Sequence, residues 1–311
     1  MIDQNWPRSP PKTILLATDL SSRGDRALDR AAQLARQWNA RLVVVHAIEG
    51  ASDGPNWSDL DDAPSWRRPP EAAIAIERQI RRDLREEVDD LLIHIEEGDP
   101  VQVILATIER EECDLVVLGT ARDELFGRML LGDTVEHIVR KSPVSVLIVK
   151  TRPHGAYRHL LIGSDFTEES KRGLSVAAKL FPDAAFTVMH AFVLPYRALL
   201  LDNKLSRDFA AMEMASIETF IEEAGLPSEI RQRVLPIIEH GLPEAMLRKY
   251  IVEQGADLTV IGAFGRGIMF HVFIGGTARR IVDAAPSDVL VVRARRETER
   301  RTVSTPIPAS T

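Results

Sequence analysis

The sequence is poor in cysteine and has no long apolar run. Its 311 residues include one cysteine, Cys113, which excludes a disulfide framework within the chain and fits a reducing compartment. No apolar run approaches the roughly 18 residues that a membrane-spanning helix needs. The first residues, MIDQNWPRSPPK, lack the apolar core of a signal peptide. We therefore expect a cytoplasmic protein without a membrane partner.

An excess of positive charge is also lacking. The formal net charge is −7, which argues against a nucleic-acid-binding surface as the main function. The one basic cluster, RARRETERR at residues 293–301, leads into a tail rich in Ser, Thr and Pro. We interpret this end of the chain as a solvated tail, with an anion-binding arm as the alternative.

What the sequence does contain is an internal repeat. KTILLATDLSS corresponds to RHLLIGSDFTEES, which aligns Asp19 with Asp165, and RLVVVHAIEG corresponds to AFTVMHAFVL, which aligns His46 with His190. Farther along, the offset is constant at 143 positions, as three pairs show: Gly98 and Gly241, Gly119 and Gly262, and Pro143 and Pro286. The chain therefore carries two copies of one domain.

Within each copy, short apolar runs alternate with amphipathic stretches of helical length. This pattern predicts an α/β fold with two doubly wound, parallel, five-stranded sheets. In the first copy it predicts strands at 13–18, 41–47, 91–95, 115–119 and 144–149 and helices at 24–38, 71–90, 100–111 and 133–141. In the second copy it predicts strands at 159–164, 185–191, 234–239, 258–262 and 288–293.

Two irregular stretches divide the chain. TRPHGAYR at 151–158 interrupts the pattern, so we predict domains over 1–150 and 156–296, followed by a disordered tail over 297–311. Residues 50–70 form a second irregular stretch, interpreted as a surface loop with a lid as the alternative. The fifth strands, VSVLIVK and DVLVVR, are apolar edge strands, so we expect the copies to pack through them as an intrachain pseudo-dimer.

The glycines of VIGAFGRGIMFHVFIGGTARRIV carry the main chemical signal. Gly262 ends a strand, Gly265 follows, and Gly275 with Gly276 opens a helix. Such glycines let the backbone approach a ligand closely, and the helix amino end favours an anion. The stretch therefore predicts a phosphate-binding loop.

The chain resembles a tandem universal stress protein over residues 12–294. The resemblance rests on these glycines, on the Asp after the first strand, on the His that closes the second strand and on Pro286. The resemblance implies the Rossmann-like, adenine nucleotide alpha hydrolase-like fold, and binding of ATP or another adenine nucleotide, with Mg²⁺ as a further possibility. It implies that Asp165 and Ala191 hold ribose and adenine. The full binding set that it implies is Gly163, Asp165, Ala191, Gly262, Phe264, Gly265, Gly275, Gly276 and Thr277.

The first copy departs from the family pattern where phosphates would bind. Gly119 and Gly132 are in place, but Arg122 stands where the second glycine belongs and Asp133 where a Ser or Thr belongs. We expect Asp133 to act as an N-cap that occupies the helix amides and repels a triphosphate. We therefore interpret the first copy as a degenerate site.

The second copy departs less. Gly276 replaces the family's final hydroxyl residue but keeps its backbone N–H, and Thr277 offers a hydroxyl one position later. Losing one hydrogen bond to a charged group costs about 1.5 to 3 kcal/mol. Nucleotide affinity should therefore fall without vanishing.

The remaining candidate residues indicate structure rather than chemistry. His46 and His190 end apolar strands at matching places, so we interpret them as structural histidines, with a general base as the alternative. No His or Cys spacing indicates a metal site, and Cys113 is interpreted as a small buried filler. No catalytic residue is assigned.

Three classes of function remain. The first is a stress-response regulatory protein with an adenine nucleotide in its C-terminal domain and without rapid turnover. The second is an interaction or scaffold protein that binds no nucleotide. The third is a slow ATP-hydrolysing enzyme, although S-G-G-x-D-S, H-x-G-H and Walker A loops are absent from the sequence. For any of these classes, a homodimer is an alternative to the intrachain pseudo-dimer alone.

The tail supplies the first testable prediction. Residues 297–311 show no apolar periodicity, so truncation after residue 296 should leave the melting temperature within about one degree of the full chain. Thermal unfolding followed by circular dichroism measures this. A drop of many degrees would show that the tail is docked on the folded domains.

Overall fold

The computed structural model describes residues 10–21, 24–48, 72–85, 88–120, 132–193, 203–263 and 276–293. The 50–70 stretch and the 297–311 tail, for which a loop and disorder were predicted, lie outside these residues. So do three members of the expected binding set, Phe264, Gly265 and Gly275.

The first half follows the predicted alternation closely. Its strands are β1 (Thr13–Ala17), β2 (Arg41–Ile48), β3 (Leu91–Glu97), β4 (Leu115–Gly119) and β5 (Ser145–Val149). Its helices are α1 (Gly24–Trp38), α2 (Ala72–Asp83), α3 (Pro100–Arg110) and α4 (Asp133–Lys141). The helix predicted over 71–90 ends at Asp83, and residue 90 directly precedes β3, where the carbonyl of Asp90 accepts a hydrogen bond from the Leu42 amide.

The second half repeats this order with one addition. Its strands are β6 (His159–Ser164), β7 (Ala185–Phe192), β8 (Val234–His240), β9 (Leu258–Gly262) and β10 (Asp288–Val292). Its helices are α5 (Glu168–Leu180), α6 (Asn203–Glu223), α7 (Ser228–Arg231), α8 (Pro243–Gln254) and α9 (Gly276–Ala284). The short α7 was not predicted.

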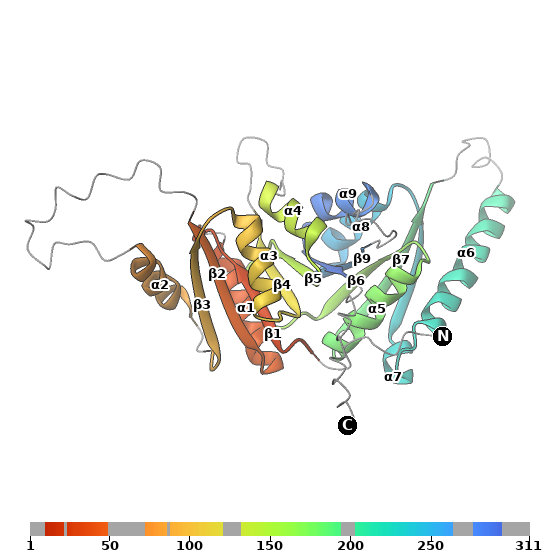
Figure 1. Cartoon of the computed structure of the whole chain (residues 1–311). Coiled ribbons are helices and arrows are strands. Elements are labelled where there is room, and N and C mark those ends of the chain that lie inside the picture. The colour runs from red at the N-terminus through yellow and green to blue at the C-terminus, as the bar shows by residue number, and fades with distance from the viewer. Residues whose placement is uncertain are drawn as a thin grey trace, which may run out of the picture.

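All ten strands form one sheet, in the order β3-β2-β1-β4-β5-β10-β9-β6-β7-β8 (Figure 1). Pairing is parallel within each half, and β5 and β10 join the halves in antiparallel orientation. This confirms the α/β fold and the expected contact through the fifth strands. The two predicted sheets are thus halves of a single one.

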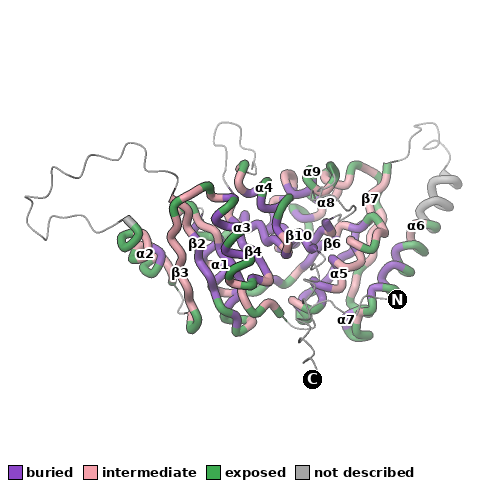
Figure 2. The backbone as a smooth tube through the Cα atoms, in the orientation of Figure 1, coloured by how far each residue is buried: buried purple, intermediate pink, exposed green. Residues whose placement is uncertain are grey.

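Helices cover both faces of this sheet. Because side chains alternate across a strand, Ile14 and Leu16 pack beneath α1 while Leu15 packs on the opposite face. One core lies between the sheet and α1, α2, α5 and α6, and the other lies between the sheet and α3, α4, α8 and α9. The central strands are buried almost throughout (Figure 2).

The two halves are related by an approximate two-fold axis between β5 and β10. Leu147 pairs with Leu290, and these residues occupy corresponding positions, 143 apart. Corresponding residues therefore face each other near the axis. Glu136 and Arg279, also 143 positions apart, meet in an ion pair of 2.8 Å between α4 and α9, which lie on the same side of the sheet (Figure 1).

Each half also ends in a buried cation that reaches a helix of the other half. Lys150 donates its ammonium to the carbonyls of Val282 and Ala285 at the end of α9, and Arg293 donates to the carbonyl of Val139 in α4. A cation is favourable at a helix carboxyl end. Burial lowers the pKa of Lys150 to about 8, while the charges of Asp283 and Asp288 oppose this shift.

Asp288 organises the junction between the linker and the sheet. It is fully buried, and its carboxylate accepts from the Lys150 amide at 2.8 Å, from the Thr151 amide and hydroxyl at 2.9 Å and from the Tyr157 hydroxyl at 2.6 Å. Arg30, which is 3% exposed, lies over the Tyr157 ring, and its Nε is 3.6 Å from Asp288. Burial, followed by the Asp288 charge, raises the pKa of Tyr157 well above its ordinary value.

This network gives a second prediction. Asp288→Ala should lower the free energy of unfolding by about 3–5 kcal/mol, because it leaves the Arg30 guanidinium buried beside an unpartnered Tyr157. Urea denaturation of the full chain measures the loss.

Ser145→Ala is the matched control, because Ser145 occupies the corresponding position in the first half and its hydroxyl accepts one hydrogen bond, from the Arg293 amide at 3.1 Å. It should cost about 0.5–1.5 kcal/mol. Equal losses for the two variants would contradict the central role of Asp288.

Candidate functional site

The two central strands of the second half separate before they end. β6 continues to Ser164 and β9 to Gly262, but their pairing stops at Ile162 and Val260. In the first half, β1 and β4 stay paired to the last residue of β1. The strand order reverses between β6 and β9, and ligands of doubly wound sheets bind at the carboxyl ends of strands at such a point. We call the carboxyl ends of β6, β7 and β9 with the amino end of α9 the switch-point site.

Asp165 directly follows β6 at this site and is exposed. Its Oδ1 accepts from the Thr167 amide at 3.2 Å and from the Thr167 hydroxyl at 2.6 Å. Both hydrogen bonds use Oδ1, so Oδ2 keeps its capacity to accept from a ligand hydroxyl. In the first half, Asp19 makes the same two bonds to Ser21.

Ala191 lies beside Asp165, one residue beyond the last β6–β7 pair, which joins Ser164 to His190. It pairs with Glu239 of β8 on its other side. Within the described residues, the backbone edge of Ala191 that faces β6 therefore has no strand partner. A free backbone edge of this kind can hydrogen-bond a heterocycle such as adenine.

His190 is held by the backbone, like its counterpart in the first half. Its Nδ1 lies 2.8 Å from the Ser164 carbonyl, and His46 Nδ1 lies 2.8 Å from the Thr18 carbonyl. Because a carbonyl only accepts, Nδ1 carries the proton in both rings. The matching geometry supports the structural interpretation of both histidines. His190 Nε2 additionally lies 3.7 Å from a carboxylate oxygen of Glu213 on α6.

A row of aromatic rings, Phe166, His190 and Phe192, distinguishes the second half from the first. Phe166 stacks on His190 with ring centroids 4.2 Å apart, and Phe192 lies nearly parallel to His190 at 6.5 Å. Leu20 and Ile48 occupy the corresponding positions in the first half. Phe166 has a positive φ of 61° and Leu20 one of 58°, so this backbone conformation belongs to the repeated fold and the side chain is what differs. Sequence reasoning missed these aromatic residues, although comparing the two copies at these positions would have found them.

Gly262 has a structural reason to be glycine. A Cβ at this position would lie 2.4 Å from the Glu169 backbone and 2.7 Å from the Ser170 amide, because the first turn of α5 packs directly against β9. Gly163 on β6 is less restricted, since its nearest neighbour would be the Leu247 side chain at 3.3 Å. The glycine that the sequence assigns to phosphate binding is thus required by helix packing.

The amino end of α9 begins at Gly276, as predicted. Thr277 follows and is exposed, and its hydroxyl accepts from Arg280 Nη2 at 3.0 Å. Arg280 in turn donates through Nε to Glu244 of α8 at 2.8 Å. Neither Arg280 nor Glu244 was among the predicted site residues, because only the fold brings α8 and α9 together.

The first half differs from the prediction at its corresponding helix. Asp133 is the first residue of α4, and Gly132 is the N-cap, so the expectation that Asp133 caps the helix is wrong. The helix begins one residue earlier than a cap at Asp133 requires, since the amide of Glu136 bonds to the carbonyl of Gly132. The Asp133 carboxylate still adds negative charge to the first turn. Arg122 lies outside the described residues.

Cys113, the one cysteine in the sequence, is buried. Burial, followed by the charges of Glu111 and Asp114, raises the pKa of the Cys113 thiol to about 12. A thiol with a raised pKa is a poor nucleophile. Cys113 thus behaves as the filler that the sequence predicts.

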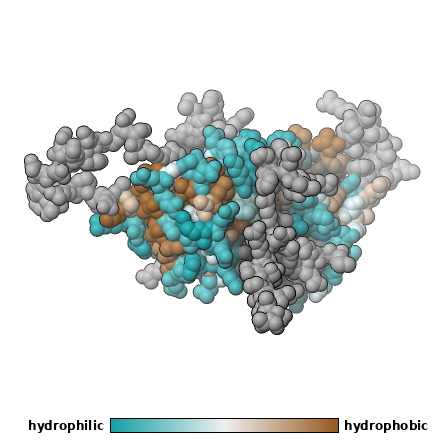
Figure 3. Space-filling model, in the orientation of Figure 1, coloured by the Kyte–Doolittle hydropathy of each residue, from teal (hydrophilic) through white to brown (hydrophobic). Residues whose placement is uncertain are grey.

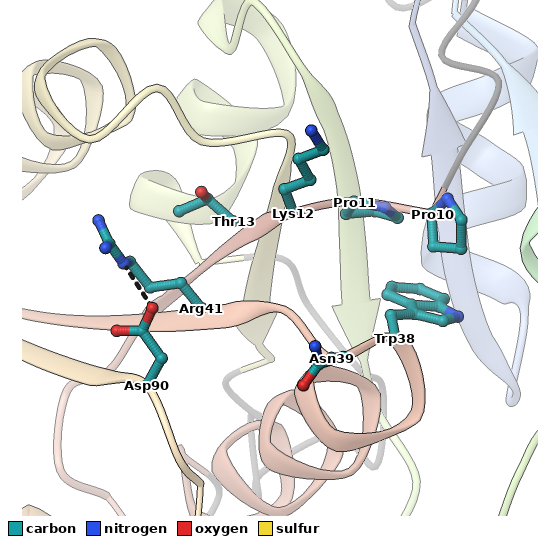
Figure 4. A pocket seen from close by; sticks show the side chains of 8 residues that line it. All are labelled: Pro10, Pro11, Lys12, Thr13, Trp38, Asn39, Arg41 and Asp90. Atoms are coloured by element: carbon teal, nitrogen blue, oxygen red, sulfur yellow. Dashed lines mark hydrogen bonds and ion pairs between the residues drawn. The ribbon is translucent and has the colours of Figure 1, made fainter.

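A surface depression of about 560 Å³ lies in the first half (Figure 4). Its lining includes Lys12, Trp38 and the ion-paired Arg41 and Asp90. These residues stand at the amino ends of β1, β2 and β3 in the first half, whereas the switch-point site is formed by β6, β7, β9 and α9 of the second half. The depression is therefore separate from the site.

Comparison with known proteins places this arrangement in a family. The model of the Universal stress protein family matches residues 11–150 and again residues 156–293. The chain belongs to the universal stress protein family. Its two matches make it a tandem member, and membership supports a role in the stress response.

Curated relatives match one half of the chain. A universal stress protein of Thermus aquaticus is 33% identical over 139 residues, covering 45% of this chain and 98% of its own length. A universal stress protein of Mycobacterium tuberculosis is 30% identical over 145 residues, covering 45% of this chain and 97% of its own length.

Solved structures match almost the whole chain. A universal stress protein from Archaeoglobus fulgidus covers 92% of this chain and 99% of its own, with a TM-score of 0.65 and 19% identity. A putative universal stress protein from Pseudomonas aeruginosa covers 92% of this chain and 94% of its own, with a TM-score of 0.65 and 22% identity. At these identities the likeness concerns the fold.

The packing at Gly262 gives a third prediction. Gly262→Ala should lower the free energy of unfolding by about 3 kcal/mol, the upper end of the range for overpacking, because the added methyl meets backbone atoms of α5. Gly276→Ala is the control, since its nearest neighbour would be the Arg280 guanidinium at 3.5 Å, and it should cost under about 0.5 kcal/mol. Urea denaturation compares them. If Gly262→Ala leaves the free energy of unfolding unchanged, helix packing does not require this glycine and ligand binding would be its only role.

Proposed function

We propose that this universal stress protein is a regulatory protein that binds an adenine nucleotide at the switch-point site of its second half. The observation that carries the proposal is the early separation of β6 from β9, directly before Asp165. The first half is proposed to act as the structural partner of the second.

The roles of the residues follow from their chemistry. The free oxygen of Asp165 accepts from a ribose hydroxyl, and the open backbone edge of Ala191 bonds the adenine. The ring face beside Phe166 and Phe192 offers stacking area for a purine. Backbone amides at Gly276 and Thr277 face the phosphates at the helix amino end. Mg²⁺ would arrive with the nucleotide, held by its phosphate oxygens.

The difference between the halves is one of charge as well as shape. Asp133 places a carboxylate in the first turn of α4, where Gly276 places none in α9. Like charges at contact distance cost several kcal/mol where solvent is partly excluded, roughly 4 kcal/mol at 4 Å for an intermediate dielectric. This exceeds the cost of the hydroxyl absent at Gly276. The nucleotide is therefore proposed to select the second half.

Calorimetric titration of the full chain with ATP and Mg²⁺ tests this proposal. We expect at most one site per chain, abolished by Gly265→Arg and strengthened by Gly276→Ser, which adds a hydroxyl donor. Gly265→Arg reproduces the residue that the first half carries naturally at position 122.

Asp133→Ala is the control and should leave the titration unchanged. If Gly265→Arg leaves binding intact while Asp133→Ala alters it, the roles of the two halves are reversed. If the wild type releases no heat and shows no shift in melting temperature with ATP, the second candidate, an interaction protein without nucleotide, replaces this one.

Self-association stays a prediction. The two ends of the sheet are β3 and β8, and a second chain that extends the sheet would add there. β8 carries Pro236 in its middle, which cannot donate to a partner strand, whereas β3 has no proline. Hydrophobic side chains are visible around the β3 end of the molecule (Figure 3).

No helix in the described part of the chain has the length and hydrophobicity that crossing a bilayer requires.

A further inference from the structure

Arg280 occupies an unusual place for a cation. It lies one turn into α9, yet its guanidinium folds back toward the amino end of the helix. Nη2 donates to the Thr277 hydroxyl at 3.0 Å, and Nη1 lies 3.5 Å from the position that a Cβ on Gly276 would take. The side chain is 53% exposed. The guanidinium therefore stands over the first turn of α9, at the edge of the switch-point site.

The positive charge of Arg280 lies near the positive end of the α9 helix dipole. The amino end of a helix carries positive partial charge, so a cation above it is repelled unless an anion joins them. Glu244 of α8 supplies one carboxylate, with Oε1 2.8 Å from Arg280 Nε. Its other oxygen, Oε2, is buried and has no hydrogen-bond partner among the described residues. Glu244 thus engages the guanidinium through Oε1 alone.

We infer that Arg280 binds the phosphates of the ligand and makes the switch-point site selective for polyphosphates over nucleosides. The inference rests on the proposed nucleotide site. Phosphate oxygens accept from the planar guanidinium fork and from helix amides at once, which a neutral nucleoside cannot do. Glu244 orients the Arg280 guanidinium, and part of the guanidinium's hydrogen bonding transfers from Glu244 to the phosphates when the ligand binds. Arg280 also supplies a donor where Gly276 lacks the hydroxyl.

The first half shows the same position without this chemistry. His137 corresponds to Arg280 and Val101 to Glu244, each 143 positions earlier. The His137 ring contacts the carbonyl of Asp133 at 2.8 Å. Where the second half presents a guanidinium, the first half therefore presents an imidazole bonded to the backbone carbonyl of Asp133. The difference favours an anionic ligand in the second half alone.

The neighbouring residue provides a matched control. Arg279 carries the same charge on the same helix, but its Nη1 donates to Glu136 of the first half at 2.8 Å. Removing Arg279 changes the net charge as much as removing Arg280 does. A comparison of the two separates a specific phosphate contact from a general electrostatic effect.

Calorimetric titration of the full chain with ATP, adenosine and inorganic tripolyphosphate tests the inference. Arg280→Ala should weaken ATP binding by about tenfold to a hundredfold, the range for lost charge-assisted hydrogen bonds, and adenosine binding by less than about twofold. Arg279→Ala should change neither by more than about twofold. Glu244→Gln should strengthen ATP binding, because it removes the competing negative charge.

The outcomes are separable. Equal weakening by Arg280→Ala and Arg279→Ala, or equal weakening of ATP and adenosine, overturns the inference while leaving the nucleotide site in place. Tripolyphosphate that binds wild type but not Arg280→Ala, without any binding of ATP or adenosine, supports Arg280 and overturns the proposed nucleotide. A wild-type chain that binds none of the three overturns both. Unchanged melting temperatures for the two arginine variants exclude unfolding as the cause.

Discussion

The antiparallel pairing of β5 with β10 determines where the rest of the chain lies. Each strand would be a bare apolar edge if its half stood alone, and each covers the other. The pairing also delivers Lys150 and Arg293 to carbonyls of the opposite half, so both cations are satisfied only in the joined structure. Because the axis passes between Leu147 and Leu290, α4 and α9 meet beside it.

Fusion of the two copies allows an asymmetry that a symmetric dimer cannot have. At an isologous interface a residue near the axis meets its own copy, so Glu136 would face Glu136. Here it faces Arg279 at the corresponding position. The same freedom gives Asp288 a network of four donors where Ser145 makes one bond. The tandem chain is thus fixed in one pairing while its halves carry different residues at corresponding positions.

The glycine pattern and ligand binding are separate properties of this fold. Gly262 is required because the backbone of α5 approaches β9 too closely for a side chain. Gly262 is therefore required for packing whether or not a ligand binds, so this glycine by itself does not indicate binding. What distinguishes the halves is charge and aromatic surface near the helix end, at Asp133, Phe166 and Arg280.

The sequence by itself determined the repeat, the family, the order of elements and most strand boundaries to within a residue or two, because apolar periodicity and turn residues are local signals. Only the tertiary structure decided the end of α2 at Asp83, the cap at Gly132 and the register between β5 and β10. It alone revealed the pairing of Arg280 with Glu244 and of Asp288 with Tyr157. Those contacts join residues 36 and 131 positions apart, and no local pattern encodes which distant side chains the packing of helices on a sheet will bring together.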